Sequence, residues 1–376
     1  MAETTSNFAD LQKYEPGYYF EYVRDSGLKE FMSASPMSII NVKTQTQSGG
    51  KLINIPLISA SNRRQTGTRD LVGREIEVRN QDVAAFPYYQ REATVVDQLQ
   101  QHLSYVDLYK AQKDVLKYSD IDQMRGNFIH ALGAIANDQT VLDYEDAHSQ
   151  QVSLFEPTDT ANLLTTARQN AWAAANEYRI LAGGAESNYS ATYSTLIGNV
   201  DAAAEAMSRD FVKVAKVMAK RRLRTGFGDS VDIPSIRPIR VTGGQEFFVM
   251  FHDQLSFKAL KDDLETTNLD GRARDHRSNP VFQDGELIYD GVAHIEIPEI
   301  PAISSTVGTS FLCGAQAMAY ARGSNQRFTQ RDETDYGFKK GIGTQSHYSI
   351  EKMKYAPRGT TAPMDHGVLT CFTYTG

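Results

Sequence analysis

The sequence predicts an α+β protein with a long extended arm, and three features of the chain lead to this prediction. Residues 43–48 continue a strand-like segment, but their side chains are polar on both faces of the strand. Residues 119–146 carry apolar side chains at every third or fourth position, which is typical of a long helix. Later segments alternate between apolar strands and short helices, as in a mixed body. Because a strand that is polar on both faces cannot lie in a core, we expect the arm to rest on a partner.

The N-terminal region and the arm come first along the chain. Residues 1–37 are polar and aromatic by turns, and we expect an N-terminal arm with a short helix at about 16–31. Residues 38–92 are predicted to form an extended hairpin, in which residues 41–49 alone reach about 30 Å. An ordinary solvated hairpin that turns at residues 48–50 is the alternative. The cationic residues proposed to contact a neighbouring subunit are Lys51, Arg63, Arg64, Arg69, Arg74 and Arg79.

A strand at 91–96 and helical sequence at about 104–118 lead into the long helix. The long helix is predicted to begin at Ser119, because Ser119 and Asp122 can satisfy the free amides of a first turn. Its apolar positions extend to Leu142. At about 1.5 Å per residue this helix is about 35 Å long, so it can form the backbone of a lobe.

A second amphipathic helix is predicted at 202–224. Its apolar face contains Phe211, Val214, Ala215 and Met218, which we expect to pack on the core. The simplest interpretation of the other face is that its cations favour the helix dipole and solvent. The alternative is contact with packaged nucleic acid or an acidic partner. The candidate DNA-facing residues are Lys213, Lys216, Lys220 and Arg224.

The remaining elements are predicted from apolar runs and alternation. Residues 245–252 form an apolar run of the kind found in strands covered on both faces, and Asp253 can cap a helix that follows through Leu260. Alternation at 290–297 predicts another strand. A strand at 309–314 is expected to lead into a short helix at 315–321, and residues 368–374 are expected to form the final strand.

Length, composition and charge limit the classes of protein. A chain of 376 residues is long enough for two lobes, or for one lobe with large excursions. The hydrophobic content of 41% and the charged content of 23% are typical of a soluble protein, and no apolar run is long enough for a membrane span. We find no secretory signal and expect the protein in the cytoplasm. A net charge of -7 argues against a surface that binds nucleic acid everywhere, although local basic patches remain compatible.

The sequence contains no complete catalytic motif. The acidic cluster after the long helix could hold a divalent metal, but charged residues at a helix end are ordinary. His252 and His294 are single residues without a nucleophile or base nearby, and we interpret both as structural. Cys313 and Cys371 have no metal or redox spacing and are expected to be buried. The residues of the acidic cluster are Asp143, Glu145, Asp146 and His148.

The order of these parts resembles the major capsid protein family of tailed bacteriophages. Two late segments add to the resemblance, Asn-Pro-Val-Phe followed by Asp-Gly-Val within 279–292, and Gly-Ala-Gln-Ala within 311–320. The resemblance implies the Hong Kong-phage type of capsid fold. The domains that it implies are an N-terminal arm at 1–37, an extended loop at 38–92, a peripheral domain with the long spine helix at 93–159, a mainly axial domain at 160–365 with peripheral segments at about 270–300, and a C-terminal strand at 366–376.

The resemblance also implies a structural protein without enzymatic activity, cofactor or metal. Copies of the chain would form hexamers and pentamers of an icosahedral shell, assembled in the host cytoplasm and found in the virion. The implied partners are a scaffolding protein, a portal, double-stranded DNA bound without sequence specificity and, left open, a decoration protein. No membrane is involved. Lys51 lies where some relatives crosslink subunits, but we interpret it as an ordinary exposed lysine. The alternatives are a bacterial nanocompartment shell, another virion part such as a tail or portal component, and a metal-dependent hydrolase.

Overall fold

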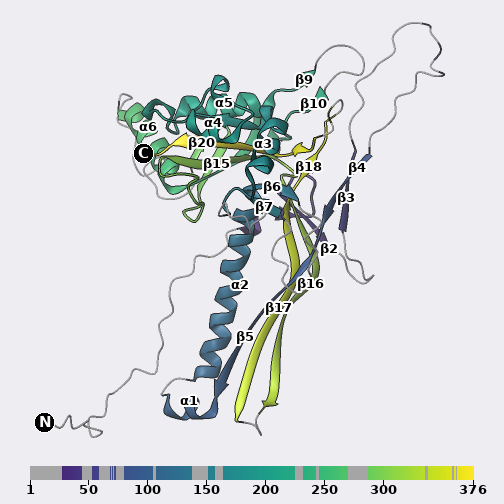
Figure 1. The fold of residues 1–376 in the computed structure, drawn as a ribbon, viewed down its shortest axis with the longest axis vertical. Helices are drawn as coiled ribbons and strands as arrows, with labels where there is room; N and C mark the ends of the chain where they lie inside the picture. Colours follow the sequence, from purple (N-terminus) through teal and green to yellow (C-terminus); the bar gives the residue numbers. More distant parts are fainter. Residues whose placement is uncertain are drawn as a thin grey trace, which may run out of the picture. The chain divides into compact units, whose positions relative to one another are not determined.

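The computed structural model describes residues 28–44, 53–58, 68, 70, 72, 80–104, 107–137, 151–156, 164–224, 232–242, 245–269, 287–334, 338–357, 360 and 362–376. The chain divides into two compact units. Among the described residues, unit 1 contains Tyr89–Arg125 and Ser324–His347, and unit 2 contains Leu28–Tyr88, Gly126–Gly323 and Tyr348–Gly376. Each unit is described separately (Figure 1).

Unit 1 contains the greater part of a long helix and of three long strands, whose remaining residues belong to unit 2. The helices are α1 (Gln98–Leu103) and α2 (Leu108–Leu132), and the strands are β5 (Tyr88–Asp97), β16 (Met318–Thr334) and β17 (Lys339–Lys352). The strands lie in the order β16-β17-β5 within a sheet that β2 (Ile40–Thr44) and β1 (Met32–Ser33) extend beyond β16. On β17 the buried side chains Ile342, Thr344 and Ser346 alternate with those of the other face. Ser346 donates to Asp120 of α2 at 3.4 Å, so this buried face packs on α2.

The predicted start and end of the long helix are wrong. The helix begins at Leu108, where Asp107 accepts a hydrogen bond from the Lys110 amide at 3.2 Å, so Ser119 lies inside it. Residues 104–118 favour helix by their intrinsic propensity, so the helix can start at Asp107 and continue through Ser119. The helix ends before Gly133, and a strand follows instead of more helix. An added Cβ on Gly133 would lie 2.6 Å from the ring of Phe155, so the close approach of the next hairpin requires glycine there.

Unit 2 is built on a seven-stranded mixed sheet. Its strands follow the order β13-β14-β12-β15-β20-β8, with β11 also paired to β12. The strand β12 is parallel to β14 and antiparallel to β15. The bounds are β8 (Ile180–Ala182), β11 (Arg240–Thr242), β12 (Gln245–His252), β13 (Leu287–Tyr289), β14 (Val292–Glu296), β15 (Val307–Cys313) and β20 (Val368–Tyr374).

Helices cover both faces of this sheet. On one face α5 (Arg209–Lys220) and α6 (Gln254–Leu269) pack on a core that includes Phe248 and Leu312. On the other face α3 (Thr166–Ala175) and α4 (Tyr193–Gly198) pack on a core that includes Val307 and Phe372. Alternate residues of the last strand enter the two cores, which is why its sequence is apolar throughout. The described part of the chain contains no helix that is both long and apolar enough to cross a membrane.

Shorter elements complete unit 2. The hairpin strands are β3 (Ile53–Ile58) with β4 (Asn80–Ala85), β6 (Ala134–Asn137) with β7 (Gln151–Ser153), β9 (Leu223–Arg224) with β10 (Asp232–Ile233), and β18 (Lys354–Tyr355) with β19 (Met364–Asp365). The 3-10 helices are η1 (Leu28–Phe31), η2 (Glu177–Arg179), η3 (Glu186–Asn188) and η4 (Ala203–Glu205).

Most of the predicted strands are confirmed. The strands predicted at 245–252 and 368–374 have the observed bounds of β12 and β20. Asp253 accepts from the Ser256 amide at 3.4 Å at the start of α6, as its predicted capping role requires. The helix predicted at 315–321 is wrong, because β16 begins at Met318 and pairs in parallel with β2. The long-range partner of these small residues is not visible in the local pattern.

Candidate functional site

The hairpin predicted at 38–92 is not formed as expected, because β2 pairs in parallel with β16, and the paired strands are β3 and β4. This β3–β4 hairpin is anchored in its own subunit. The strands β3 and β4 pair antiparallel from Ile53 opposite Ala85 to Ile58 opposite Asn80. Their buried side chains Ile55 and Val83 join a small core with Ala319 and Ala321 of β16. We therefore infer that this base is a fixed platform for the longer segment that it carries.

Two polar contacts strengthen this anchor. The side-chain amide of Gln81 donates to the Ala356 carbonyl at 2.6 Å and accepts from the Ala356 amide at 2.8 Å. The Phe86 amide donates to the buried Glu351 carboxyl at 2.7 Å. Burial raises the pKa of Glu351 to about 7, and it lowers the pKa of Lys354 to about 7. The base of the hairpin is thus tied to the end of β17 and to β18.

The residues predicted to contact neighbouring subunits do not belong to these two strands. Lys51, Arg63, Arg64, Arg69, Arg74 and Arg79 fall outside the described residues, so their role stays a prediction. The observed geometry concerns only the two strands that present this segment.

A buried ion pair holds the strands next to the hairpin. Lys352 Nζ lies 3.0 Å from Asp365 Oδ2, with side-chain exposures of 1% and 0%. The Trp172 indole donates to the same carboxylate at 3.4 Å, and Arg179 donates to the Asp365 carbonyl at 3.3 Å. The Asn176 side chain accepts from the Asp365 amide at 2.8 Å. Sequence analysis missed this network because its members come from two distant parts of the chain, 172–179 and 352–365.

The basic residues of α5 are paired within the subunit. Lys213 pairs with Asp210 at 2.8 Å, Lys216 with Asp290 at 3.1 Å and Lys220 with Glu246 at 2.9 Å. Lys216 also donates to the Asp290 carbonyl. The side chain of Arg224 is outside the described residues. Because each described lysine has an acidic partner, this face carries little free positive charge, which favours the structural interpretation; contact with DNA stays a prediction.

The predicted helix at 202–224 is shorter in the structure. Only residues 209–220 form α5, and Ser208 caps it by accepting from the Phe211 amide at 3.3 Å. Residues 203–205 form a separate 3-10 turn, and residues 223–224 belong to β9. The predicted apolar face is correct, since Phe211, Ala215 and Met218 are buried and Val214 packs against them.

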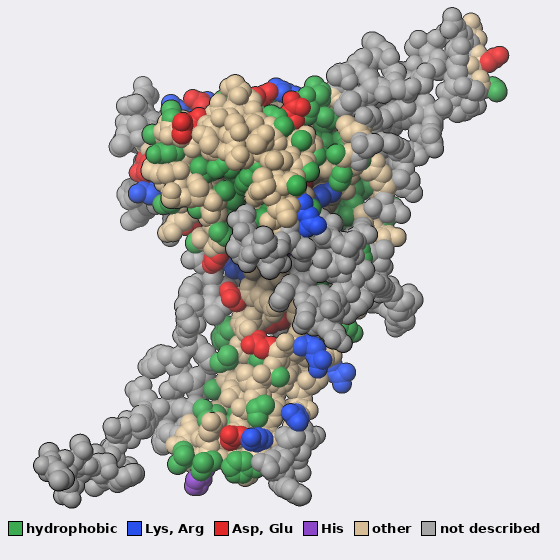
Figure 2. Space-filling model, in the orientation of Figure 1, with side chains coloured by type: hydrophobic (Ala, Val, Ile, Leu, Met, Phe, Trp, Pro, Cys, Tyr) green, Lys and Arg blue, Asp and Glu red, His purple; other side chains and the backbone are tan. Residues whose placement is uncertain are grey.

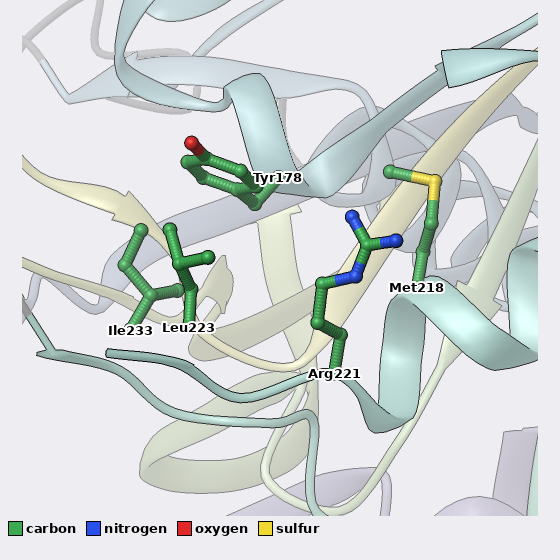
Figure 3. A pocket seen from close by; sticks show the side chains of 5 residues that line it. All are labelled: Tyr178, Met218, Arg221, Leu223 and Ile233. Carbon is green, nitrogen blue, oxygen red and sulfur yellow. The ribbon is translucent and has the colours of Figure 1, made fainter. Parts of the chain in front are cut away.

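A small apolar pocket lies at the end of α5. Figure 3 shows Tyr178, Leu223 and Ile233 on one side of the pocket, and Arg221 and Met218 on the other. This cavity has a volume of about 10 Å³, and a neighbouring one of about 320 Å³ shares Tyr178, Leu223 and Ile233. The Arg221 guanidinium binds both Glu186 oxygens, at 2.8 and 2.7 Å.

The two histidines are a pair, which corrects the view of them as single residues. His252 Nε2 lies 2.8 Å from His294 Nδ1, and His252 Nδ1 lies 3.0 Å from the Ser310 hydroxyl. The three residues are on adjacent strands, which local sequence could not show. Burial lowers the pKa of both imidazoles, that of His294 to about 3. Both imidazole rings are fully buried, so neither His252 nor His294 can contact a substrate. This burial agrees with a structural role for the pair.

The other candidate sites remain without support. Asp143, Glu145, Asp146 and His148 lie outside the described residues, and the described residues contain no group of three or more potential metal ligands of these types. Cys313 and Cys371 are free and buried, as predicted. Burial raises the pKa of both thiols, that of Cys313 to about 12, so neither is a reactive thiolate.

A long helix beside long strands, a mixed sheet covered by helices and an anchored extended hairpin define a capsid subunit of the Hong Kong-phage type. The capsid asymmetric unit of cyanophage Pam1 is similar, with a TM-score of 0.79 and 27% identity over 100% of this chain and 99% of that chain. The capsid of Ralstonia phage GP4 has a TM-score of 0.67 and 16% identity, covering 100% and 98%. The chain belongs to the phage capsid protein family, whose model matches residues 4–375.

A curated relative agrees with this family. The major capsid protein of Pseudomonas phage KPP25 is 32% identical over 121 residues, which are 28% of this chain and 32% of that protein. The matched part thus spans about a third of the relative. These matches favour a structural capsid protein over the nanocompartment and hydrolase alternatives.

Proposed function

We propose that this chain is the major capsid protein of a tailed phage and that its copies assemble into the icosahedral head shell around double-stranded DNA. The match of the capsid family over residues 4–375 carries the proposal. The anchored hairpin base supports it, because a rigid platform can present a long segment to a neighbouring copy. Hexamers and pentamers of the chain would be the building units, with a scaffolding protein and a portal as partners and with assembly in the host cytoplasm.

The physics of assembly suits such a subunit. Stable interfaces bury about 2,000 Å² or more, but most of the gross stabilisation is offset by lost rigid-body freedom, ordering and desolvation. Each contact is then modest and reversible, so misplaced subunits can leave before the shell closes. Polar residues at 43–48 also reduce the risk that an extended strand aggregates before assembly.

The experiment that tests this function is electron microscopy of the purified protein, alone and with its candidate scaffold. Closed icosahedral shells or ring-shaped capsomers are expected. Particles that contain a protein cargo and no nucleic acid would support the nanocompartment alternative. Open tubes, or rings that are neither hexameric nor pentameric, would indicate a tail or portal component, and a compact monomer under all conditions would contradict the proposal.

The hairpin itself can be tested by a deletion that the register defines. Because Ile58 lies opposite Asn80, residues 59–79 can be replaced by an Asn-Gly turn that closes the two strands. We expect the variant to fold with an unchanged thermal midpoint, since the base contacts through Gln81 and Glu351 remain. It should not form shells in the microscope. Normal shells from this variant would show that the segment is dispensable.

A further inference from the structure

A cavity of about 320 Å³ lies in unit 2, where three segments of the chain meet. The segments are the end of α3 with η2, the hairpin of β9 and β10, and the residues that join β18 to β19 together with the start of β19. We call this space the α3 cavity. A volume of this size is typical of binding sites for small molecules. The α3 cavity is therefore large enough to hold a small ligand.

One wall of the α3 cavity is apolar. Leu223 of β9, Ile233 of β10 and Met364 of β19 line it. Ile233 and Met364 are buried, so this wall belongs to the packed interior of unit 2. The small side chains of Ala174 and Ala175 leave the space open at the end of α3. Such a wall favours a ligand with methylene groups, because these groups gain free energy when they leave water.

Another part of the lining is negatively charged. Among the described residues that line the α3 cavity, Glu177 alone has a charged side chain. Glu177 lies just after the C-terminal end of α3, where the helix dipole adds partial negative charge. The Tyr178 hydroxyl donates to this carboxylate, and burial together with the carboxylate raises the pKa of Tyr178, so the phenol stays neutral. A carboxylate beside an aromatic ring favours a cation.

The positive charge of Arg221 does not cancel this negative charge. Arg221 lines the smaller cavity that shares Tyr178, Leu223 and Ile233 with the α3 cavity (Figure 3). Its guanidinium binds both oxygens of Glu186, at 2.8 and 2.7 Å, so its charge is already paired. The α3 cavity therefore keeps a preference for a positively charged ligand.

A second acceptor comes from the segment between β18 and β19. The Thr360 hydroxyl donates to the Pro357 carbonyl at 2.9 Å, so its oxygen is still able to accept a hydrogen bond. Thr360 and Pro357 both line the α3 cavity. Glu177 and Thr360 thus offer acceptors on two different segments of the chain, which suits a ligand with two amino groups.

Acidic side chains alone do not distinguish this place from the rest of the surface. Figure 2 shows acidic side chains at several places on the viewed face of unit 2, with basic ones among them. The α3 cavity differs because it combines space, an apolar wall and a carboxylate at a helix end. This combination matches a molecule with an apolar chain and a positively charged end.

We propose that the α3 cavity binds a linear aliphatic diamine or polyamine. Its methylene chain lies against the apolar wall, one ammonium group pairs with the Glu177 carboxylate, and another donates to Thr360. The inference goes beyond the proposed shell function and does not depend on it. Because the bound amine connects three segments of unit 2, it should stabilise the folded unit. Double-stranded DNA holds a layer of counter-cations, so packaged DNA would bring such amines to the shell.

Isothermal titration calorimetry of the purified subunit with putrescine tests this inference. Putrescine is a diamine with a four-carbon chain, and we expect one molecule to bind per subunit. Butylamine keeps the chain but has a single amino group, and the straight-chain diol of the same length has no charge. We expect butylamine to bind more weakly than putrescine. The diol should bind about 10-fold or more weakly, because it loses the charge-assisted hydrogen bond. A diol that binds as tightly as putrescine would overturn the proposal of a cationic ligand.

A charge variant tests the carboxylate. Glu177→Gln changes an exposed side chain and keeps an acceptor for Tyr178, so the subunit should fold. Its affinity for putrescine should fall about 10-fold or more. Asp201→Asn removes the charge of another exposed acid, which is not among the described lining residues, and should bind like the wild type. An unchanged affinity of Glu177→Gln, or an equal loss in both variants, would show binding to the acidic surface in general and would overturn the proposal.

A size variant tests the cavity itself. Ala174 and Ala171 are both exposed on α3, and leucine is a good helix former, so Ala174→Leu and Ala171→Leu should keep the wild-type thermal midpoint. Of the two alanines, only Ala174 lines the α3 cavity. Ala174→Leu should therefore lose putrescine binding, whereas Ala171→Leu should keep it. Equal binding by the two variants would overturn the proposal.

The outcomes separate this inference from the proposed function, because the titrations use free subunits. A wild type that binds putrescine but forms no shells would remove the proposed function and leave the inference. A wild type that forms shells but binds no putrescine would remove only the inference. If, in addition, Ala174→Leu slows shell formation, the cavity holds a side chain of another copy, which also overturns the proposal.

Discussion

The buried histidine pair makes the stability of the subunit depend on pH. Burial holds the pKa of His252 and His294 below the ordinary value near 6.5, so the folded state keeps both rings neutral. Above pH 6.5 the unfolded chain is neutral at these positions too, and the full stability is present. As the pH falls below 6.5, the unfolded chain binds protons that the folded chain refuses, so stability is lost.

His294→Gln tests this dependence. The variant keeps a hydrogen-bonding group beside His252 but removes one titrating ring. The slope of unfolding free energy against pH between 4.5 and 6 should therefore be smaller than in the wild type by up to about 1.4 kcal/mol per pH unit. Urea unfolding at several pH values measures it. The slopes of the variant and the wild type must be compared because other groups also change the stability with pH. Burial raises the pKa of Glu351 to about 7, so this carboxyl makes the folded state more stable as the pH falls. Parallel curves would contradict the prediction.

Replacing only one member of the buried Lys352 and Asp365 pair is expected to lower the free energy of unfolding strongly. Removing one member leaves the other as an uncompensated buried charge, which destabilises by about 3–5 kcal/mol. We expect Lys352→Met to lose this amount, and Lys352→Met with Asp365→Asn to lose less than Lys352→Met alone. The asparagine can still accept the Trp172 hydrogen bond. Urea denaturation of both single variants and the double variant measures the coupling, and additive losses would contradict it.

For helix α5, mutation can distinguish a basic face that is paired within the subunit from one that contacts DNA. Its three described lysines pair with Asp210, Asp290 and Glu246, and such surface pairs add little to stability because water screens them. We expect replacement of Lys213, Lys216, Lys220 and Arg224 by Gln to lower subunit stability slightly. The salt dependence of DNA retention in filled particles should not change. A shallower salt dependence would instead indicate that these residues contact phosphates.

Elements with a local signal were predicted, and those that depend on distant partners were not. The strands β12 and β20 and the cap at Asp253 follow from apolar runs and one polar side chain. The predicted start of α2 is wrong because Asp107 and Ser119 can both cap a helix. In the structure Asp107 caps the helix, and Ser119 lies inside it. The strand at 318 was mistaken for helix because its pairing partner, β2, is far away in the sequence.

The same limit applies to the candidate site. The family resemblance came from the order of parts and two late segments, and the family match confirms it. The histidine pair combines residues that are 42 positions apart, so no short window of sequence contains it. Lys352 and Asp365 are only 13 positions apart, but their polar network also needs Asn176, which is 189 positions from Asp365.

At the scale of the whole molecule, assembly should change which parts of the chain a protease can reach. The candidate contact residues are mostly arginines at 63–79, and trypsin cuts after arginine. If this segment lies on a neighbouring subunit, cleavage there should be at least 10-fold slower in closed shells than in free subunits. Mass spectrometry of timed digests identifies each cut.

An internal comparison makes this digest decisive. Lys213 and Lys216 pair with acids of their own subunit, so any difference in cleavage there reports burial of α5 in the shell and not protection of the hairpin. The ratio of cleavage at 63–79 to cleavage after Lys213 should therefore fall on assembly. A constant ratio would mean that the hairpin gains no neighbour when the shell forms, and it would remove the contact role of Arg63, Arg64, Arg69, Arg74 and Arg79.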